Sequence, residues 1–183
     1  MHAIDVWNLR PNDESTGVGP IINVLVVLVM SQSDSGGADL GDEVGQSKTA
    51  NALFAVALDS IGLRQGVRAF SVHPGGIVTD LIRHMSQAQI DASEILDRTG
   101  KPIIDPKHNK KTPQQGAATT VWCATSPQLN GMGGVYCADC DIARALPSDD
   151  SKEMHGVRPR ATDPVAAGRL WQLSEQLTGA TID

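Results

Sequence analysis

The apolar positions of this chain fall into short aliphatic runs that alternate with longer amphipathic segments. Residues 21–30 form a run rich in Val and Ile, bounded by Pro20 and by a Ser/Gly-rich stretch, which predicts a strand buried on both faces. Residues 67–72 and 133–137 are shorter apolar runs next to glycine-rich turns, and they predict two further strands.

Helical periodicity occupies much of the chain between these runs. After a predicted loop at residues 31–42, residues 46–61 predict a helix whose apolar face is formed by Ala50, Leu53, Phe54, Ala57, Leu58 and Ile61. Residues 85–96 predict a second helix of moderate amphipathicity, and residues 98–111 are polar enough to predict an exposed loop.

Two further helices carry clear start signals. Thr112 and Gln115 can form a capping box with a proline at the first helical position, and this helix should end before the Ser-Pro pair at residues 126–127. After a long loop at residues 139–160, Asp163 begins a last helix that stops at Gly179. Its predicted apolar side comprises Ala167, Leu170, Trp171, Ser174 and Leu177.

Strands that alternate with helices predict an α/β fold, here a partial doubly wound, Rossmann-like parallel sheet flanked by helices. Residues 1–20 contain too many turn-forming residues for a stable element, so we expect an irregular, mobile N-terminal segment. Residues 21–183 form the predicted domain.

Composition narrows the function classes. The formal net charge is -6, and no basic stripe with interleaved aromatics is visible, which disfavours nucleic-acid binding and adhesion to an anionic membrane. The longest apolar run is far shorter than the roughly 20 residues that span a bilayer. Three cysteines do not make a disulfide framework and suit the reducing cytoplasm.

Two ordered motifs carry a family resemblance. The sequence Gln-Ser-Lys-Thr-Ala-Asn at residues 46–51, followed by His-Pro-Gly-Gly-Ile-Val-Thr at residues 73–79, resembles the second half of short-chain dehydrogenases/reductases, especially the retinol-dehydrogenase-like and WW-domain-oxidoreductase-like branch. Residues 134–136 resemble the last strand of that family, and residues 162–171 its C-terminal helix. The resemblance covers about residues 45–178 and implies the C-terminal portion of an NAD(P)-binding domain.

The resemblance also implies an active site. The family places a catalytic tyrosine four residues before the lysine that Lys48 matches, and Val44 stands at that position. A Pro-Gly turn with a threonine beyond it faces the nicotinamide of NAD or NADP. The residues that the resemblance assigns to the cofactor are Lys48, Pro74, Gly75, Ile77 and Thr79.

The chemistry explains why the substitution at position 44 matters. Hydride transfer between nicotinamide and a carbon requires a proton to move at the alcohol or carbonyl oxygen. A tyrosine phenol, whose ordinary pKa is about 10, becomes competent when an ammonium group one helical turn away favours the phenolate. Valine has no proton to give, so we expect Lys48 to have lost the partner through which it would act on an alcohol or carbonyl substrate.

The family's active-site serine follows the strand that residues 21–30 match. Ser31 and Ser33 both follow this run, and we favour Ser31 as the counterpart. A different register would place residues 21–24 on the strand and leave the next six residues as an insertion. A third reading, that both serines only open a loop, stays equally open.

The dinucleotide loop of the family lies in an N-terminal βαβ unit, which needs roughly 30 residues or more. Val44 is preceded by 43 residues that include a predicted strand, and the Thr-Gly-Val-Gly at residues 16–19 is followed by Pro20. We therefore expect the N-terminal dinucleotide-binding βαβ units to be absent and the chain to be truncated or a pseudoenzyme. Two rivals are a dehydrogenase with an altered acid/base and a binding module that pairs, through an exposed sheet edge, with a copy of itself or a full-length relative.

Other candidate groups have simpler explanations. Cys137 and Cys140 form a CxxC without a second pair or histidines at zinc spacing, so no metal site is expected. His73 is expected to pack beside the Pro-Gly turn. Residues 107–111 are interpreted as a solvated loop or a lid over the substrate, and the two aspartates at residues 149–150 as surface groups.

Overall fold

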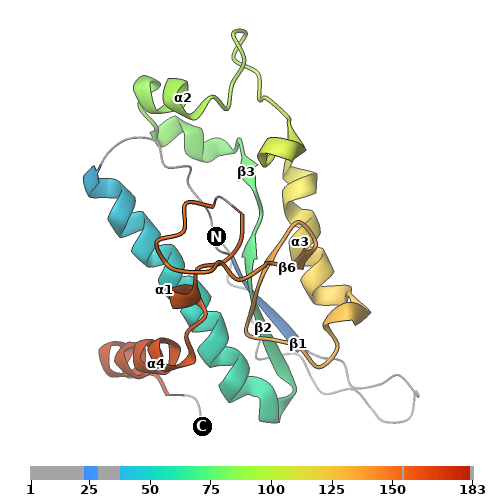
Figure 1. Ribbon diagram of the computed structural model, residues 1–183, viewed down its shortest axis with the longest axis vertical. Coiled ribbons are helices and arrows are strands. Elements are labelled where there is room, and N and C mark those ends of the chain that lie inside the picture. The colour runs from blue at the N-terminus through green and yellow to red at the C-terminus, as the bar shows by residue number, and fades with distance from the viewer. Residues whose placement is uncertain (1–22, 29–37, 154, 182–183) are drawn as a thin grey trace.

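The computed structural model describes residues 23–28, 38–153 and 155–181. These residues form an α/β structure in which a central sheet lies between helices (Figure 1). The predicted mobile segment at residues 1–20 and both candidate serines, Ser31 and Ser33, lie outside the described residues.

The central sheet is mainly parallel and has the strand order β1-β2-β5-β6. Strands β1 (Asn23–Leu28), β2 (Val67–His73) and β5 (Val135–Ala138) run parallel and confirm the three predicted strands. The short β6 (Asp141–Ile142) adds an antiparallel edge. Because β1 includes residues 25–28, the register that made them an insertion is wrong.

A second, two-stranded parallel sheet joins β3 (Gly76–Ile77) to β4 (Lys110–Lys111). The helices are α1 (Ala38–Gly62), α2 (Gln87–Ser93), α3 (Pro113–Thr125) and α4 (Pro164–Thr178). Short 3-10 turns lie at Leu63–Gln65, Asp80–His84, Pro106–His108, Pro127–Leu129 and Pro159–Ala161. Of the described helices, none is both long and apolar enough to cross a membrane.

Helix α1 begins earlier than predicted, at Ala38, so residues 38–42 are helical and do not belong to a loop. Asp39, Asp42 and Glu43 favour this start because acidic residues interact well with the positive end of the helix dipole. Two glycines in the first turns each cost about 1 kcal/mol relative to alanine, which weakens a helix without breaking it.

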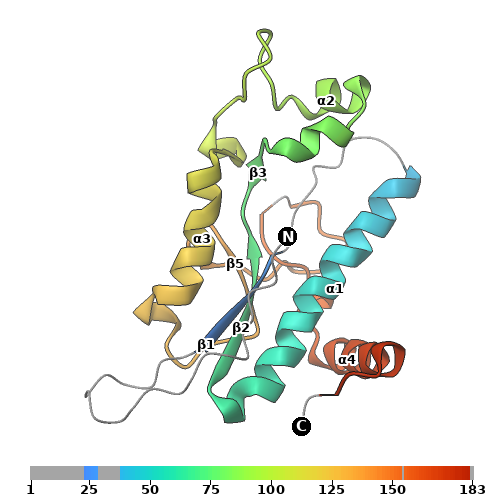
Figure 2. The same ribbon diagram turned by 180° about the vertical axis from the view of Figure 1, so that it is seen from behind.

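The two main helices cover opposite faces of the sheet (Figures 1 and 2). Ala69 of β2 packs with α1 and α4, whereas its neighbour Phe70 packs with Cys123 of α3, because successive strand residues point to opposite faces. The connections β1-α1-β2 and β2-α3-β5 both step in the same direction along the sheet. Because the helices of these two crossovers lie on opposite faces, the crossovers have opposite hands. One of them is therefore left-handed, although crossovers between parallel strands are almost always right-handed.

The helix starts predicted by capping signals are confirmed. Thr112 and Gln115 form the expected capping box at α3, and the side chain of Asp163 caps α4, which ends at Gly179. Two details of the predicted helices were wrong, namely the length of α2 and the extent of the buried side of α4. Helix α2 spans only seven residues, because its cap is Ser86 and Glu94 takes a left-handed conformation. Leu177 is 78% exposed, since the predicted apolar side of α4 extends past the part that packs on α1.

Candidate functional site at the carboxyl edge of the sheet

Lys48 lies on α1 near the carboxyl ends of the strands. Helix α1 ends at Gly62, beside Val67 at the start of β2, so its N-terminal part lies toward the opposite, carboxyl edge. Ala52 is buried in a cluster that includes Tyr136 of β5. Lys48 is one turn, about 6 Å, further along the same side of the helix, and it is half-buried.

Val44 precedes Lys48 by one further turn of the same helix. Residues four apart lie on one helix face, so the backbone keeps the spacing that an acid/base and its lysine require. Neither Glu43 nor Gly45 lies on this stripe. The position at which the family resemblance places a proton donor is therefore occupied by valine within the continuous helix α1.

Pro74 and Gly75 form the turn after β2 and are both buried. Gly75 has φ +91°, a conformation that favours glycine, and its backbone N–H donates to His73 Nδ1 at 3.0 Å. A Cβ on this glycine would lie 2.7 Å from Lys111 Cδ and 2.9 Å from Asn109 Oδ1. Glycine is thus required here by the packing of the chain itself.

The turn continues into β3, which is held from two sides. The backbone N–H of Gly76 donates to the Asn109 carbonyl at 2.7 Å, and Ile77 pairs with Lys111 in the β3–β4 ladder. On the other side, the Ile77 side chain reaches Gly116 of α3, where a Cβ would overlap its terminal methyl. The Ile77 side chain therefore packs against α3.

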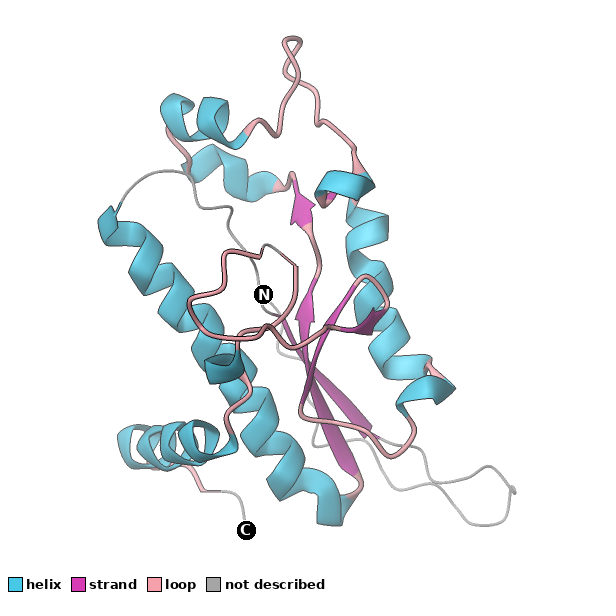
Figure 3. Cartoon of the chain, in the orientation of Figure 1, coloured by secondary structure: helices cyan, strands magenta, loops and turns pink. Residues whose placement is uncertain are grey.

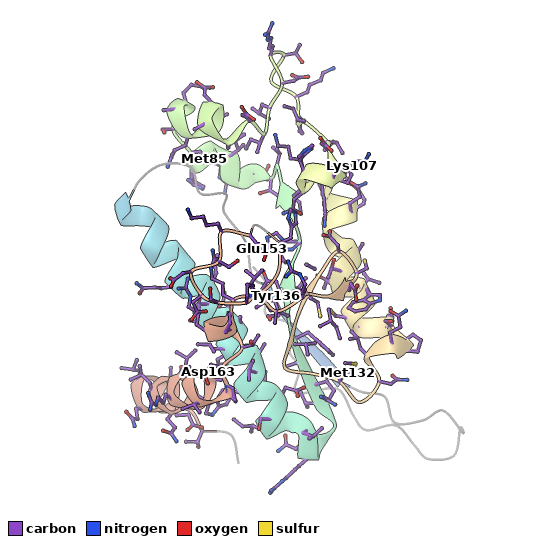
Figure 4. The ribbon with its side chains drawn as sticks, in the orientation of Figure 1. Met85, Lys107, Met132, Tyr136, Glu153 and Asp163 are labelled. Carbon is purple, nitrogen blue, oxygen red and sulfur yellow. The ribbon has the colours of Figure 1, made fainter. Side chains whose placement is uncertain are left out.

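Lys111 corrects the prediction of an exposed loop at residues 98–111. Its side chain is 8% exposed, and its ammonium group pairs with Asp139 in the turn between β5 and β6. The rest of the segment is largely exposed, including Lys107 near the N-terminal end of α3 (Figure 4). Charge alone suggested solvent exposure, but a lysine can bury its methylenes when its ammonium finds a carboxylate.

The imidazole of His73 lies next to this ion pair. Burial, followed by the positive charge of Lys111, lowers the pKa of His73 below its ordinary 6.5, while Asp139 acts in the opposite direction. Because Nδ1 accepts the Gly75 N–H, the proton of the neutral ring lies on Nε2. The predicted packing role of His73 beside the turn is confirmed by this hydrogen bond.

Tyr136 is the single tyrosine of the chain and does not replace the missing phenol. It lies between α1 and α3 near the centre of the molecule (Figure 4), in the cluster that contains Ala52. Burial raises the pKa of Tyr136 to about 12. An acid/base tyrosine needs the opposite shift, so Tyr136 has the wrong electrostatic setting for that role.

Three residues at this site were not predicted: Lys111 and Asn109, which lie against Gly75, and Asp139, which pairs with Lys111. No periodicity marks them, because they belong to a two-residue strand and to turns. Asp149, interpreted as a surface group, accepts the backbone N–H of Arg160 and so helps to order its loop. Among the described residues no cluster of His, Cys, Asp or Glu could hold a metal.

The residues that the family resemblance assigns to a dinucleotide cofactor can be compared with the described structure. Lys48, the exposed Thr79 and the backbone of the Pro-Gly turn carry hydrogen-bonding groups of the kinds that bind a ribose and a carboxamide. A diphosphate requires a glycine-rich turn that opens a helix. The helix starts seen at residues 87, 113 and 164 carry Ser, Thr and Asp caps, so none offers such a turn.

Comparison with curated proteins gives relatives over about 70% of the chain, whereas no family model matches. A "Probable oxidoreductase" of Streptomyces lividans is 41% identical over 132 residues, which are 70% of this chain and 42% of that protein. The "Short-chain dehydrogenase/reductase prx1" of Penicillium roqueforti is 35% identical over 71% of this chain and 36% of its own length. The "WW domain-containing oxidoreductase" of Danio rerio is 36% identical over 72% of this chain and 27% of its own length.

The chain thus spans less than half the length of these curated relatives. Identities of 35–41% over some 130 residues are matched by the α/β architecture and confirm the resemblance found in the sequence. This chain belongs to the short-chain dehydrogenase/reductase family of oxidoreductases.

Proposed function

We propose that this chain is a non-catalytic member of its oxidoreductase family, a pseudoenzyme that keeps the lysine and the nicotinamide-facing turn of NAD(P)-dependent alcohol and carbonyl interconversion. The observation that carries the proposal is position 44. Helix α1 presents Lys48 with a valine, not a phenol, one turn before it. Without that proton donor, general acid/base catalysis worth about 10²–10⁴-fold is lost.

Two features support the proposal. Tyr136 is buried with a raised pKa and cannot stand in for the missing phenol. Lys48, Thr79 and the turn at Pro74 and Gly75 stand at positions that the family assigns to the nicotinamide of NAD or NADP, and the described helix starts at residues 87, 113 and 164 carry no diphosphate turn. A cytoplasmic location belongs to the proposal and is supported by the free thiols of all three cysteines.

The experiment uses the 183-residue chain. We expect no rise in melting temperature with NAD⁺, NADH, NADP⁺ or NADPH, although a ligand at 100 times its Kd would stabilise the fold by about 2.7 kcal/mol. We also expect no change in nicotinamide absorbance across a panel of secondary alcohols and ketones. Turnover by the unmodified chain would overturn the proposal.

The variant Val44→Tyr separates the loss of the proton donor from the loss of cofactor binding. The described helix starts at residues 87, 113 and 164 carry no glycine-rich turn for a diphosphate, so we expect this variant also to show no turnover. Val44→Phe is the matched control, because it adds the ring without the hydroxyl. Turnover in Val44→Tyr and not in Val44→Phe would show that the cofactor site is complete and that the acid/base alone is missing.

A second candidate function is a binding module, and the observation that favours it is the position of β1. Within the described residues β1 pairs on one side only, with β2. An aliphatic strand with unpaired backbone groups is a template for another strand. The partner in this alternative is a second copy of the chain or a full-length relative.

A further inference from the structure

Lys111 lies in β4, where the chain returns to the candidate site after a long segment that projects from the sheet. Residues 78–109 leave the body between β3 and β4 and include α2 and a projecting arm (Figure 3). The return is made by a ladder of only two residues, in which Lys111 pairs with Ile77. So short a ladder is weak by itself, and a further contact must hold its position.

The Lys111 side chain supplies that contact against Gly75. Its Cδ and Cε atoms would lie 2.7 Å and 3.0 Å from a Cβ at Gly75, so the methylenes cover the glycine directly. The side chain is 8% exposed, and its ammonium group is satisfied by Asp139. The Lys111 methylenes therefore pack against the turn, and the ion pair with Asp139 holds the side chain in that position.

Asp139 is itself held firmly. It is the first residue of a two-residue turn between β5 and β6, and both turn residues have left-handed φ angles, Asp139 at 55° and Cys140 at 58°. The pattern is that of a type I′ hairpin, which fits the twist of the strands it joins. The Cys140 backbone N–H also donates to Thr119 Oγ1 of α3 at 3.2 Å.

We propose that Lys111 and Asp139 are positioning residues, whose ion pair ties the Pro74–Gly75 turn to the carboxyl end of β5 and so sets the place of the nicotinamide-facing backbone. The inference rests on the proposed function only in calling this turn nicotinamide-facing, which is what the family resemblance implies. The effect of this ion pair on the Pro74–Gly75 turn can be measured without any cofactor.

The test compares Lys111→Met and Asp139→Asn with Arg144→Met. Methionine keeps the apolar stem of Lys111 and removes its charge, and Asp139, whose side chain is 63% exposed, remains solvated. Arg144 forms an exposed pair with Glu153 and serves as the control. The first readout is hydrogen exchange of the Gly76 amide, which should become about ten- to a hundredfold faster in both test variants, as expected for a lost hydrogen bond to a charged group.

The second readout is the titration of the His73 ring by nuclear magnetic resonance. The charged and titratable groups that act on it are Lys111 from β4, Asp139 from the β5–β6 turn and His155 from the following loop. Lys111→Met should raise the pKa of His73 and Asp139→Asn should lower it, while Arg144→Met should leave it unchanged. Asp139→Glu should restore slow exchange at Gly76.

Faster exchange confined to Gly76 and its neighbours, with unchanged protection of Phe70 in β2, supports the positioning role. Equal acceleration throughout β2 would overturn it, since the pair would then act only on global stability. Unchanged exchange at Gly76 would overturn it as well. If the exchange changes and a nicotinamide dinucleotide also binds the chain, the positioning inference stands and the proposed loss of cofactor binding fails.

Discussion

At the scale of single residues, a buried ion pair joins α1 to β2. Asp59 of α1 accepts from Arg68 Nε at 2.8 Å and from Nη2 at 3.1 Å, and also from the Ala69 backbone N–H at 3.0 Å. The Asp59 and Arg68 side chains are 11% and 10% exposed. The pair also requires glycine at position 133, because a Cβ there would overlap the carboxylate.

Asp59→Ala should therefore lower the free energy of unfolding by about 3–5 kcal/mol, since the guanidinium of Arg68 stays buried without its partner. The exposed pair of Arg144 and Glu153 is the control, and Glu153→Gln should cost less than about 1 kcal/mol. Urea denaturation measures both variants. Equal, small losses in the two would show that the Asp59–Arg68 pair adds nothing beyond a surface pair.

At the scale of elements, α3 and the turn after β2 meet through a glycine. Gly116 is buried at the point where α3 crosses Ile77, and a Cβ there would overlap Ile77 Cδ1 and lie 3.3 Å from the Pro74 carbonyl oxygen. Helix propensity favours alanine over glycine by about 1 kcal/mol. Packing opposes that preference here, so glycine allows the helix to approach the candidate site.

We expect Gly116→Ala to destabilise the protein by about 1–3 kcal/mol, the usual cost of overpacking. Gly168→Ala in α4 is the matched control, because its Cβ would meet open space, and it should stabilise the protein by about 0.5–1 kcal/mol. Ile77→Val removes the overlapping methyl and should rescue Gly116→Ala in part. Thermal or urea unfolding gives all three values, and a stabilising Gly116→Ala would contradict the close approach.

At the scale of the whole molecule, the sheet ends differently at its two sides. At one side its edge is the two-residue antiparallel strand β6, whereas at the other side, within the described residues, the edge is the six-residue strand β1. Strand edges of this kind pair with other chains or are covered. This edge of the sheet favours the binding-module alternative, which requires that the chain associate with a copy of itself or with a relative.

If that alternative holds, the purified chain should elute as a species larger than a monomer in size-exclusion chromatography with light scattering. Leu173 and Leu177 of α4 are 50% and 78% exposed and could also cause association. A Leu173→Lys/Leu177→Lys variant separates the two causes, because it should leave edge pairing unchanged. A stable monomer over a wide concentration range would exclude both self-pairing and an obligate partner.

Elements marked by local chemistry were predictable. The capping box at Thr112 and the Asp163 cap depend on atoms within one helical turn, and the sequence displays them directly. The prediction was less accurate for α1, whose sheet-facing contacts include Ala52 and Ala55, because small side chains add little to an apolar pattern. Lys48 and Val44 were identifiable because their spacing is that of one helical turn.

By itself, the sequence determined the α/β class, the order of the main strands and helices, the family, and the absence of a phenol at position 44, because these depend on periodicity, capping and motif spacing along the chain. Only the tertiary structure decided that α1 and α3 cover opposite faces, that Lys111 is buried and that Asp139 pairs with it. The physical reason is distance along the chain. An ion pair between residues 28 positions apart leaves no local signal, since its stabilisation exists only once the sheet has brought both side chains to one edge.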